Sequence, residues 1–309
     1  MRIVFMGTPD FAVASLDALV KNNYDVVAVV TTTDKYGGRG GRQLLQSAVK
    51  RYALSNNIPV LQPEKLRAPD FISALKAINS DVFIVVAFRM LPEMVWSMPR
   101  LGTYNVHASL LPKYRGAAPI NWAIINGESE TGVTTFRLSH EIDTGMIALQ
   151  KSIPIDYEDN AGTLHDKLMQ LGAELLLQTI EKIQNGTLLL RRQQEDKVCH
   201  APKIHHETCK INFGQNTESV YNFVRGLSPY PGAFTSIDSR EFKIFKAKVI
   251  HDPFITHEPG KIKTDNKTYL HLACTDGWID VLELKQEGKR QMNVKEWLNG
   301  YQVSELTAV

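Results

Sequence analysis

In the first 190 residues, two patterns of apolar and polar positions alternate. Short continuous apolar runs, such as VFIVV at 82–86, are followed by segments in which apolar residues recur every three or four positions. A strand covered on both faces is apolar throughout, whereas a helix lying on a sheet is apolar along one side. The alternation predicts stacked βαβ units, and hence an α/β, Rossmann-like domain with a mainly parallel sheet.

Individual elements follow from the same pattern. The predicted strands of this region are 3–6, 25–32, 58–62, 81–87, 102–108, 131–138 and 146–155. The predicted helices are 11–20, 45–54, 71–78, 117–126 and 162–185. A tight turn with the sequence SHEIDTG joins the last two strands.

The pattern changes after residue 206. Short strands separated by turns are expected at 232–237, 240–250, 259–264, 268–274 and 277–285, with short helices at 217–225 and 294–298. Several short strands in about 100 residues are typical of a small β-barrel, of which the OB-fold is one kind. We therefore expect a domain at 1–190, a linker at 191–206 and an OB-like β-barrel domain at 207–309.

Composition restricts the class of protein. Of the 309 residues, 43% are hydrophobic and 22% are charged, and no apolar run approaches the ~18 residues that a membrane span needs. The first residues lack the features of a secretory signal, and three cysteines are too few for a disulfide framework. We expect a cytoplasmic protein without a membrane partner. The net charge of +2 neither demands nor excludes a polyanionic partner.

Three polar sets are expected at one edge of the sheet, because ligands of open α/β sheets bind outside the carboxyl ends of the strands. Asn105 and His107 end one strand and, being two residues apart, share a face. Asp143 lies in the turn between two later strands, and a glycine-rich basic loop occupies 34–42. An amide and an imidazole can donate to a carbonyl oxygen that becomes an oxyanion, while a carboxylate orients the imidazole and accepts a proton. The set suits acyl transfer to an amine.

Several longer motifs run along the chain: F-M-G-T-P-D-F at 5–11, N-V-H-A-S-L-L-P-K-Y-R-G-A-A-P-I at 105–120, I-D-T-G at 142–145, A-P-K-I at 201–204 and G-L-S-P-Y-P-G-A-F at 226–234. Together they resemble a known family, the formyltransferases that use 10-formyltetrahydrofolate. Motifs of this length are far more specific than a short glycine fingerprint. Because the motifs are spread from residue 5 to residue 234, the resemblance covers nearly the whole chain.

The resemblance implies roles for matching positions. The catalytic residues of the family fall on Asn105, His107 and Asp143. Its folate contacts fall on an S-L-L-P segment and on the end of an earlier strand: Ser109, Leu110, Leu111, Pro112, Phe88, Arg89 and Met90. The earlier segment reads A-F-R-M-L-P where many members have A-Y-G, so the pocket differs in detail. Contacts to tRNA fall on the basic loop, at Lys35, Arg39 and Arg42.

The implied reaction moves a formyl group from 10-formyltetrahydrofolate, the co-substrate, to the amino group of an initiator methionyl-tRNA. The second domain would bind tRNA, and we expect a monomer that uses neither metal nor NAD. Two other acceptors stay open, because members of the family formylate glycinamide ribonucleotide or an amino-sugar nucleotide with the same three residues. A non-catalytic RNA-binding protein is a further alternative. It needs a strongly basic second domain, whereas 206–309 holds 13 Lys/Arg and 13 Asp/Glu.

Three further motifs suggest other chemistry and are weaker. M-G-T-P-D-F has one glycine where a dinucleotide fingerprint needs three. Ser109 could complete a hydrolase triad by residue type, but it lies on no G-x-S-x-G elbow. A cluster of soft ligands could chelate zinc, although its spacing matches no standard tetrahedral pattern: Cys199, His200, His205, His206 and Cys209.

Overall fold

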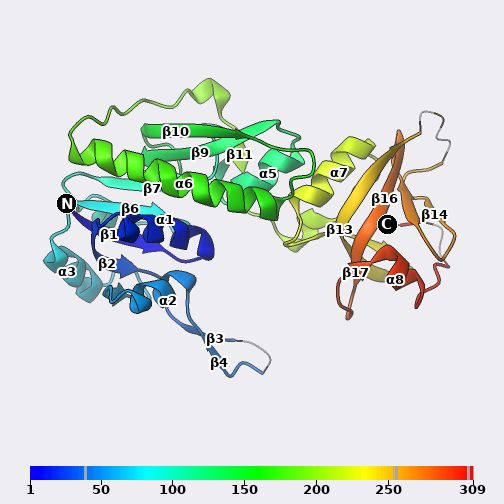
Figure 1. Ribbon diagram of the computed structural model, residues 1–309, viewed down its shortest axis with the longest axis horizontal. Coiled ribbons are helices and arrows are strands. Elements are labelled where there is room, and N and C mark those ends of the chain that lie inside the picture. Colours follow the sequence, from blue (N-terminus) through cyan, green and yellow to red (C-terminus); the bar gives the residue numbers. More distant parts are fainter. Residues whose placement is uncertain (38–39, 253, 255–256, 305–306, 309) are drawn as a thin grey trace. The chain divides into compact units, whose positions relative to one another are not determined.

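The computed structural model describes residues 1–37, 40–252, 254, 257–304 and 307–308 (Figure 1). Its contacts divide the chain into two compact units. The first unit comprises Met1–Gly116, Thr131–Ile153 and His165–His200, and the second comprises Ala117–Glu130, Pro154–Leu164 and Ala201–Val309. None of the described helices is both long enough and apolar enough to span a membrane.

The first unit is built on a seven-stranded sheet. In spatial order its strands are β10 (Ile147–Pro154), β9 (Glu130–Arg137), β7 (Thr103–His107), β6 (Val82–Val86), β1 (Arg2–Gly7), β2 (Asp25–Val30) and β5 (Val60–Leu61). The strands from β7 to β5 run parallel, and β9 is antiparallel to β7. The predicted α/β class with a mainly parallel sheet is confirmed.

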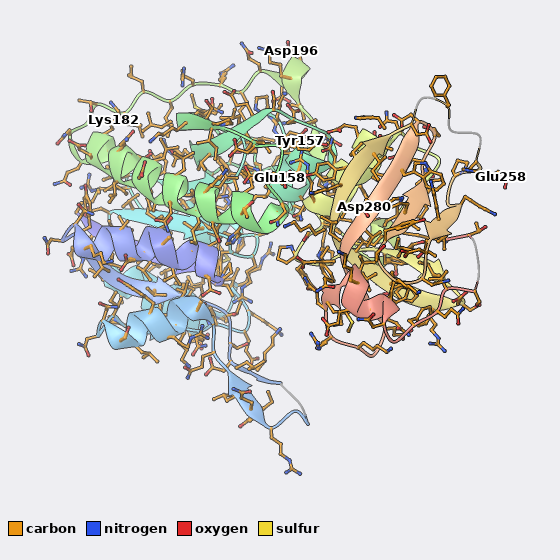
Figure 2. All side chains as sticks on the ribbon, turned by 45° about the vertical axis from the view of Figure 1, so that its right-hand side comes forward. Tyr157, Glu158, Lys182, Asp196, Glu258 and Asp280 are labelled. Atoms are coloured by element: carbon orange, nitrogen blue, oxygen red, sulfur yellow. The ribbon has the colours of Figure 1, made fainter. Side chains whose placement is uncertain are left out.

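The sheet is covered by helices whose apolar sides pack against its apolar strands. They are α1 (Asp10–Lys21), α2 (Ala48–Ser55), α3 (Pro69–Ile78), α4 (Glu93–Trp96) and α6 (Ala161–Gln184), whose last turn carries the labelled Lys182 (Figure 2). A Cβ on Gly7 would lie 2.7 Å from that of Ala12, so α1 packs tightly on the end of β1. Thr179 of α6 bonds to Thr135 of β9 through their hydroxyls at 2.7 Å.

The strand order reverses between β1 and β6, since β1 continues to β2 and β6 continues to β7. Such a reversal leaves a crevice outside the carboxyl ends of the strands, where ligands of doubly wound sheets bind. The carboxyl end of β6 leads into 87–90, and β7 ends on His107. The fold therefore brings the predicted folate segment after β6 and the predicted catalytic His107 to the same edge of the sheet.

The glycine-rich loop has paired arms that its sequence pattern did not reveal. β3 (Lys35–Gly37) and β4 (Gln43–Leu45) form an antiparallel hairpin in which Tyr36 pairs with Leu44. Three-residue strands are too short to display a period of two, and the glycines between them predict only a loop.

The second unit combines helices with an antiparallel sheet. Its strands run in the order β12 (Ala233–Ile237), β13 (Arg240–His251), β16 (Gly277–Gln286), β15 (Leu270–Ala273) and β14 (Ile262–Thr264), and β17 (Met292–Asn293) pairs with β16. Figure 2 labels Asp280 on β16. The register of β13 against β16 shifts twice near Lys246, and such bulges bend a strand. The five predicted strands are thus confirmed.

Helices α5 (Pro119–Ile125), α7 (Thr217–Gly226) and α8 (Val294–Leu298) belong to the second unit. α7 approaches α5 so closely that a Cβ on Gly226 would lie 2.6 Å from Ile125. The buried side chains of this unit, including Phe242 and Trp297, form one core. The remaining short elements are β8 (Arg115–Gly116), η1 (Glu195–Lys197), β11 (His200–Ala201) and η2 (His206–Cys209).

Candidate active site

The carboxyl end of β7 carries the amide and the imidazole. Asn105 lies opposite Val85 of β6, and His107 lies opposite Thr134 of β9. Because side chains alternate along a strand, Asn105 and His107 point to the same face. Oδ1 of Asn105 is buried without a hydrogen-bond partner among the described residues. This oxygen can therefore still accept a hydrogen bond from a ligand.

The imidazole of His107 is fixed from one side. It is 7% exposed, and its Nε2 donates to the carbonyl oxygen of Tyr114 at 2.9 Å. Since a carbonyl can only accept, Nε2 carries a proton. The ring meets Phe136 edge-on, with 6.4 Å between the centroids. Nδ1 is thus the nitrogen that is free to exchange a proton, and it lies 3.8 Å from Oδ2 of Asp143.

Asp143 lies in the turn between β9 and β10, where its φ of 56° is left-handed. Its side chain is nearly as buried as that of His107, and Oδ2 accepts a hydrogen bond from the backbone N–H of Gly116 at 2.9 Å. The gap to the imidazole is too long for a direct hydrogen bond, but it is short for two opposite charges. The structure therefore brings His107 and Asp143 together.

The S-L-L-P segment is held by a network around Thr134. The Thr134 hydroxyl donates to the Ser109 carbonyl at 2.6 Å and accepts from the backbone N–H of Leu111 at 3.0 Å. The Ser109 hydroxyl donates to the carbonyl of Lys113, also at 2.6 Å. It therefore does not donate to the imidazole, as the nucleophile of a hydrolase triad would. Leu111 packs on Phe136, and Pro112 is also buried, while Leu110 is half-buried.

The segment after β6 borders an open depression. Phe88 packs on the core, and Met90 is 68% exposed. The guanidinium of Arg89 lies 5.5 Å from the Phe88 ring centroid and donates to the carbonyls of Pro63 and Glu64. Its Nε is buried without a partner among the described residues, and burial lowers the pKa of Arg89. The depression, of about 400 Å³, is lined by Lys65, Leu66, Arg67, Arg89, Met90, Leu91 and Pro92.

Two basic side chains of the basic loop lie in the part of the chain that the structure describes. Lys35 on β3 and Arg42 before β4 are both exposed, whereas Arg39 lies outside the described residues. The start of the hairpin is anchored by Asp34, which accepts from Lys50 Nζ at 2.6 Å and from Gln62 at 2.8 Å. The hydrogen bond from Lys50 lowers the pKa of the Asp34 carboxyl.

Three of the five candidate zinc ligands have protein partners. The Cys199 sulfur accepts from the backbone N–H of Tyr114, His206 lies 3.1 Å from Glu241, and the Cys209 thiol donates to the His205 carbonyl. Burial raises the pKa of Cys209. Across the described part of the chain, no group of three or more His, Cys, Asp or Glu side chains is placed to hold a metal ion.

Two matches to known domains cover most of the sequence. Residues 1–180 match the formyl transferase domain, and residues 203–302 match the formyl transferase C-terminal domain. The chain belongs to the formyl transferase family. The resemblance inferred from its motifs is therefore confirmed, and this formyl transferase is an enzyme of one-carbon transfer.

Relatives of this formyl transferase match over almost their full lengths. A methionyl-tRNA formyltransferase of Azobacteroides pseudotrichonymphae is 52% identical over 97% of this chain and 95% of that protein. One of Parabacteroides distasonis is 50% identical over 99% of this chain and 98% of that protein. A solved sugar 3N-formyl transferase, WlaRD in the presence of dTDP and 5-N-formyl-THF, is 24% identical with a TM-score of 0.69, over 94% of this chain and 99% of that chain. The last likeness shows the shared fold.

The site of this formyl transferase contains groups that the sequence patterns did not single out. Gly116 and Tyr114 hold Asp143 and His107 through backbone atoms, which no residue-type motif reveals. Gln193 donates to the carbonyl of Asp143 from a segment with neither helical nor strand periodicity. Only the nearness of these residues in space identifies them.

Proposed function

We propose that this formyl transferase moves the formyl group of 10-formyltetrahydrofolate to the amino group of initiator methionyl-tRNA, giving the formylated tRNA used to start translation. Relatives named methionyl-tRNA formyltransferase, about half identical over nearly the full chain, support the acceptor. The observation that carries the chemistry is the buried pair of His107 and Asp143, 3.8 Å apart, at the end of the strand that also presents Asn105.

The proposed roles follow from the chemistry of these three groups and from their placement. The amine lone pair attacks the formyl carbon, and its carbonyl oxygen takes up negative charge. The Asn105 amide and the protonated Nδ1 of His107 donate to that oxygen, and removing one such donor typically costs ~3 kcal/mol of transition-state stabilisation. The carbon–N10 bond then breaks, N10 takes a proton from the pair, and the amine proton passes to Asp143. No step uses a metal ion or NAD.

Folate is proposed to lie between the two segments at the switch point. The S-L-L-P segment, Ser109 to Pro112, and the segment Phe88 to Met90 would border the pterin, since small-molecule pockets combine apolar walls with a few polar groups. Arg89 supports this placement, because it lines a depression together with two further cations, Lys65 and Arg67. Such a depression suits the anionic end of folate.

The tRNA is proposed to contact both domains. Lys35, Arg39 and Arg42 of the basic loop would contact tRNA phosphates or base edges, as arginine and lysine commonly do. We propose 1–190 as the catalytic domain, 191–206 as the linker and 207–309 as an OB-like tRNA-binding barrel. The curled antiparallel sheet supports the last assignment. We further propose a cytoplasmic monomer.

A comparison of acceptors tests the proposal. Purified protein with 10-formyltetrahydrofolate is offered methionyl-tRNA, glycinamide ribonucleotide or an amino-sugar nucleotide, and formylated product is measured. Rapid product formation with methionyl-tRNA alone is expected. Preference for either small acceptor would replace the proposed substrate, and binding of tRNA without any product would favour a non-catalytic RNA-binding protein.

A further inference from the structure

The turn that carries Asp143 is held through its backbone as well as its carboxylate. The side-chain amide of Gln193 donates to the carbonyl oxygen of Asp143 at 2.7 Å and to that of Gly145 at 2.8 Å. One NH₂ group thus joins two carbonyls of the turn, that of the left-handed Asp143 and that of Gly145. Gln193 lies in the segment before η1, the short helix that carries the labelled Asp196 (Figure 2).

The orientation of this amide is dictated by Arg115. Arg115 is 7% exposed, and its Nε and Nη2 donate to Oε1 of Gln193 at 3.1 and 2.8 Å. With its oxygen turned toward a cation, Gln193 must present its NH₂ to the two carbonyls. The remaining guanidinium donors reach the Glu195 carboxylate at 2.8 and 3.2 Å, and this hydrogen bonding lowers the pKa of Glu195.

Three consecutive residues therefore hold both members of the buried pair. The Tyr114 carbonyl accepts from Nε2 of His107, the Arg115 side chain orients Gln193, and the Gly116 N–H donates to Oδ2 of Asp143. The imidazole and the carboxylate are thus fixed to one short segment. Their separation depends on this segment and on the turn whose carbonyls accept hydrogen bonds from Gln193.

We propose that Gln193, oriented by Arg115, is a positioning residue that sets the placement of Asp143 relative to His107 during formyl transfer. The inference rests on the proposed function. Gln193 itself does not touch the reacting atoms. It acts on the carboxylate through the backbone of the turn, and misplacement of a catalytic group by ~1 Å can cost about 100-fold in rate.

Gln193→Glu tests this role, because it keeps the size and the contact with Arg115 but replaces the donating NH₂ by an oxygen that faces two carbonyls. We expect kcat for methionyl-tRNA to fall about 100-fold while KM for both substrates stays within about twofold. Gln194→Glu makes the same charge change at an exposed neighbour and is expected to leave kcat unchanged. Unchanged kcat in the Gln193 variant overturns the inference.

A second background separates positioning from general destabilisation. In an Asp143→Asn enzyme there is no carboxylate to place, so Gln193→Glu is expected to cost less than about threefold there. An equal loss in both backgrounds would mean that Gln193 only supports the fold, and would overturn the proposal. If Gln193→Glu does not fold, Gln193→Ala is measured in the same two backgrounds with the same expectations. Wild-type enzyme that formylates no acceptor would instead refute the proposed function.

Discussion

Replacing Asp143 by asparagine isolates the charge of the buried pair. The side chain keeps its shape, and its oxygen can still accept from the Gly116 N–H, which lies 2.9 Å from Oδ2 in the wild type. The fold should therefore persist. What disappears is the negative charge 3.8 Å from Nδ1 of His107.

The size of the effect follows from that distance. At 3.8 Å and an effective dielectric constant of about 20, a carboxylate and an imidazolium attract by about 4 kcal/mol. If this attraction supports the protonated imidazole in the transition state, its loss lowers kcat by about three orders of magnitude. Binding of either substrate should change little, because the substitution removes a charge and leaves the side chains that would contact the substrates in place.

Steady-state formylation of methionyl-tRNA measures this prediction directly. The expected result is a fall in kcat of about 10³-fold with nearly constant KM and an unfolding temperature close to that of the wild type. An Asp143→Asn enzyme that keeps more than about a tenth of the wild-type kcat would refute the reasoning, since one decade corresponds to only about 1.4 kcal/mol.

Three further predictions address the pocket, the turn and the second unit. Arg89→Ala should raise KM for 10-formyltetrahydrofolate at least about tenfold, since a hydrogen bond to a charged group contributes about 1.5–3 kcal/mol; equal KM values would remove Arg89 from the folate site. Gly145→Ala should abolish activity and lower the unfolding temperature, because its Cβ would lie 1.7 Å from the carbonyl oxygen of Arg137; Gly300→Ala, with no neighbour nearer than 4.0 Å, is the control. Burial lowers the pKa of His271 in the folded state, so the unfolded chain binds its proton first and the free energy of unfolding should fall as pH drops below about 6.5. His271→Gln should weaken that dependence in urea unfolding at pH 7 and pH 5, and an unchanged dependence would contradict the assignment.

Much of the fold could be predicted because its elements are strongly periodic or continuously apolar. Helix α6 keeps a helical period along its length, and the buried strands β1 and β6 are short continuous apolar runs. The strand ending at His107 is similar, so the shared face of Asn105 and His107 followed from alternation alone. The hairpin at 35–45 did not follow, because its strands are only three residues long.

The candidate site could be predicted only where side chains, rather than backbone atoms, make the contacts. The motif predicts Leu111 as a wall of the folate pocket, and it did not reveal that Leu111 also packs in a cluster with Phe136. Gln193 gave no signal, because its partners are carbonyl oxygens far away in the sequence. Tertiary contacts of this kind become visible only in three dimensions.

A double-mutant cycle on the buried pair tests the central claim most directly. Formylation rates of His107→Gln, Asp143→Asn and the double variant are compared with the wild type at saturating substrates. Because the two groups are proposed to act as one unit, the double variant should be no more than about threefold slower than the slower single variant. If the two losses multiply instead, the imidazole and the carboxylate act independently, and the account of their cooperation is wrong.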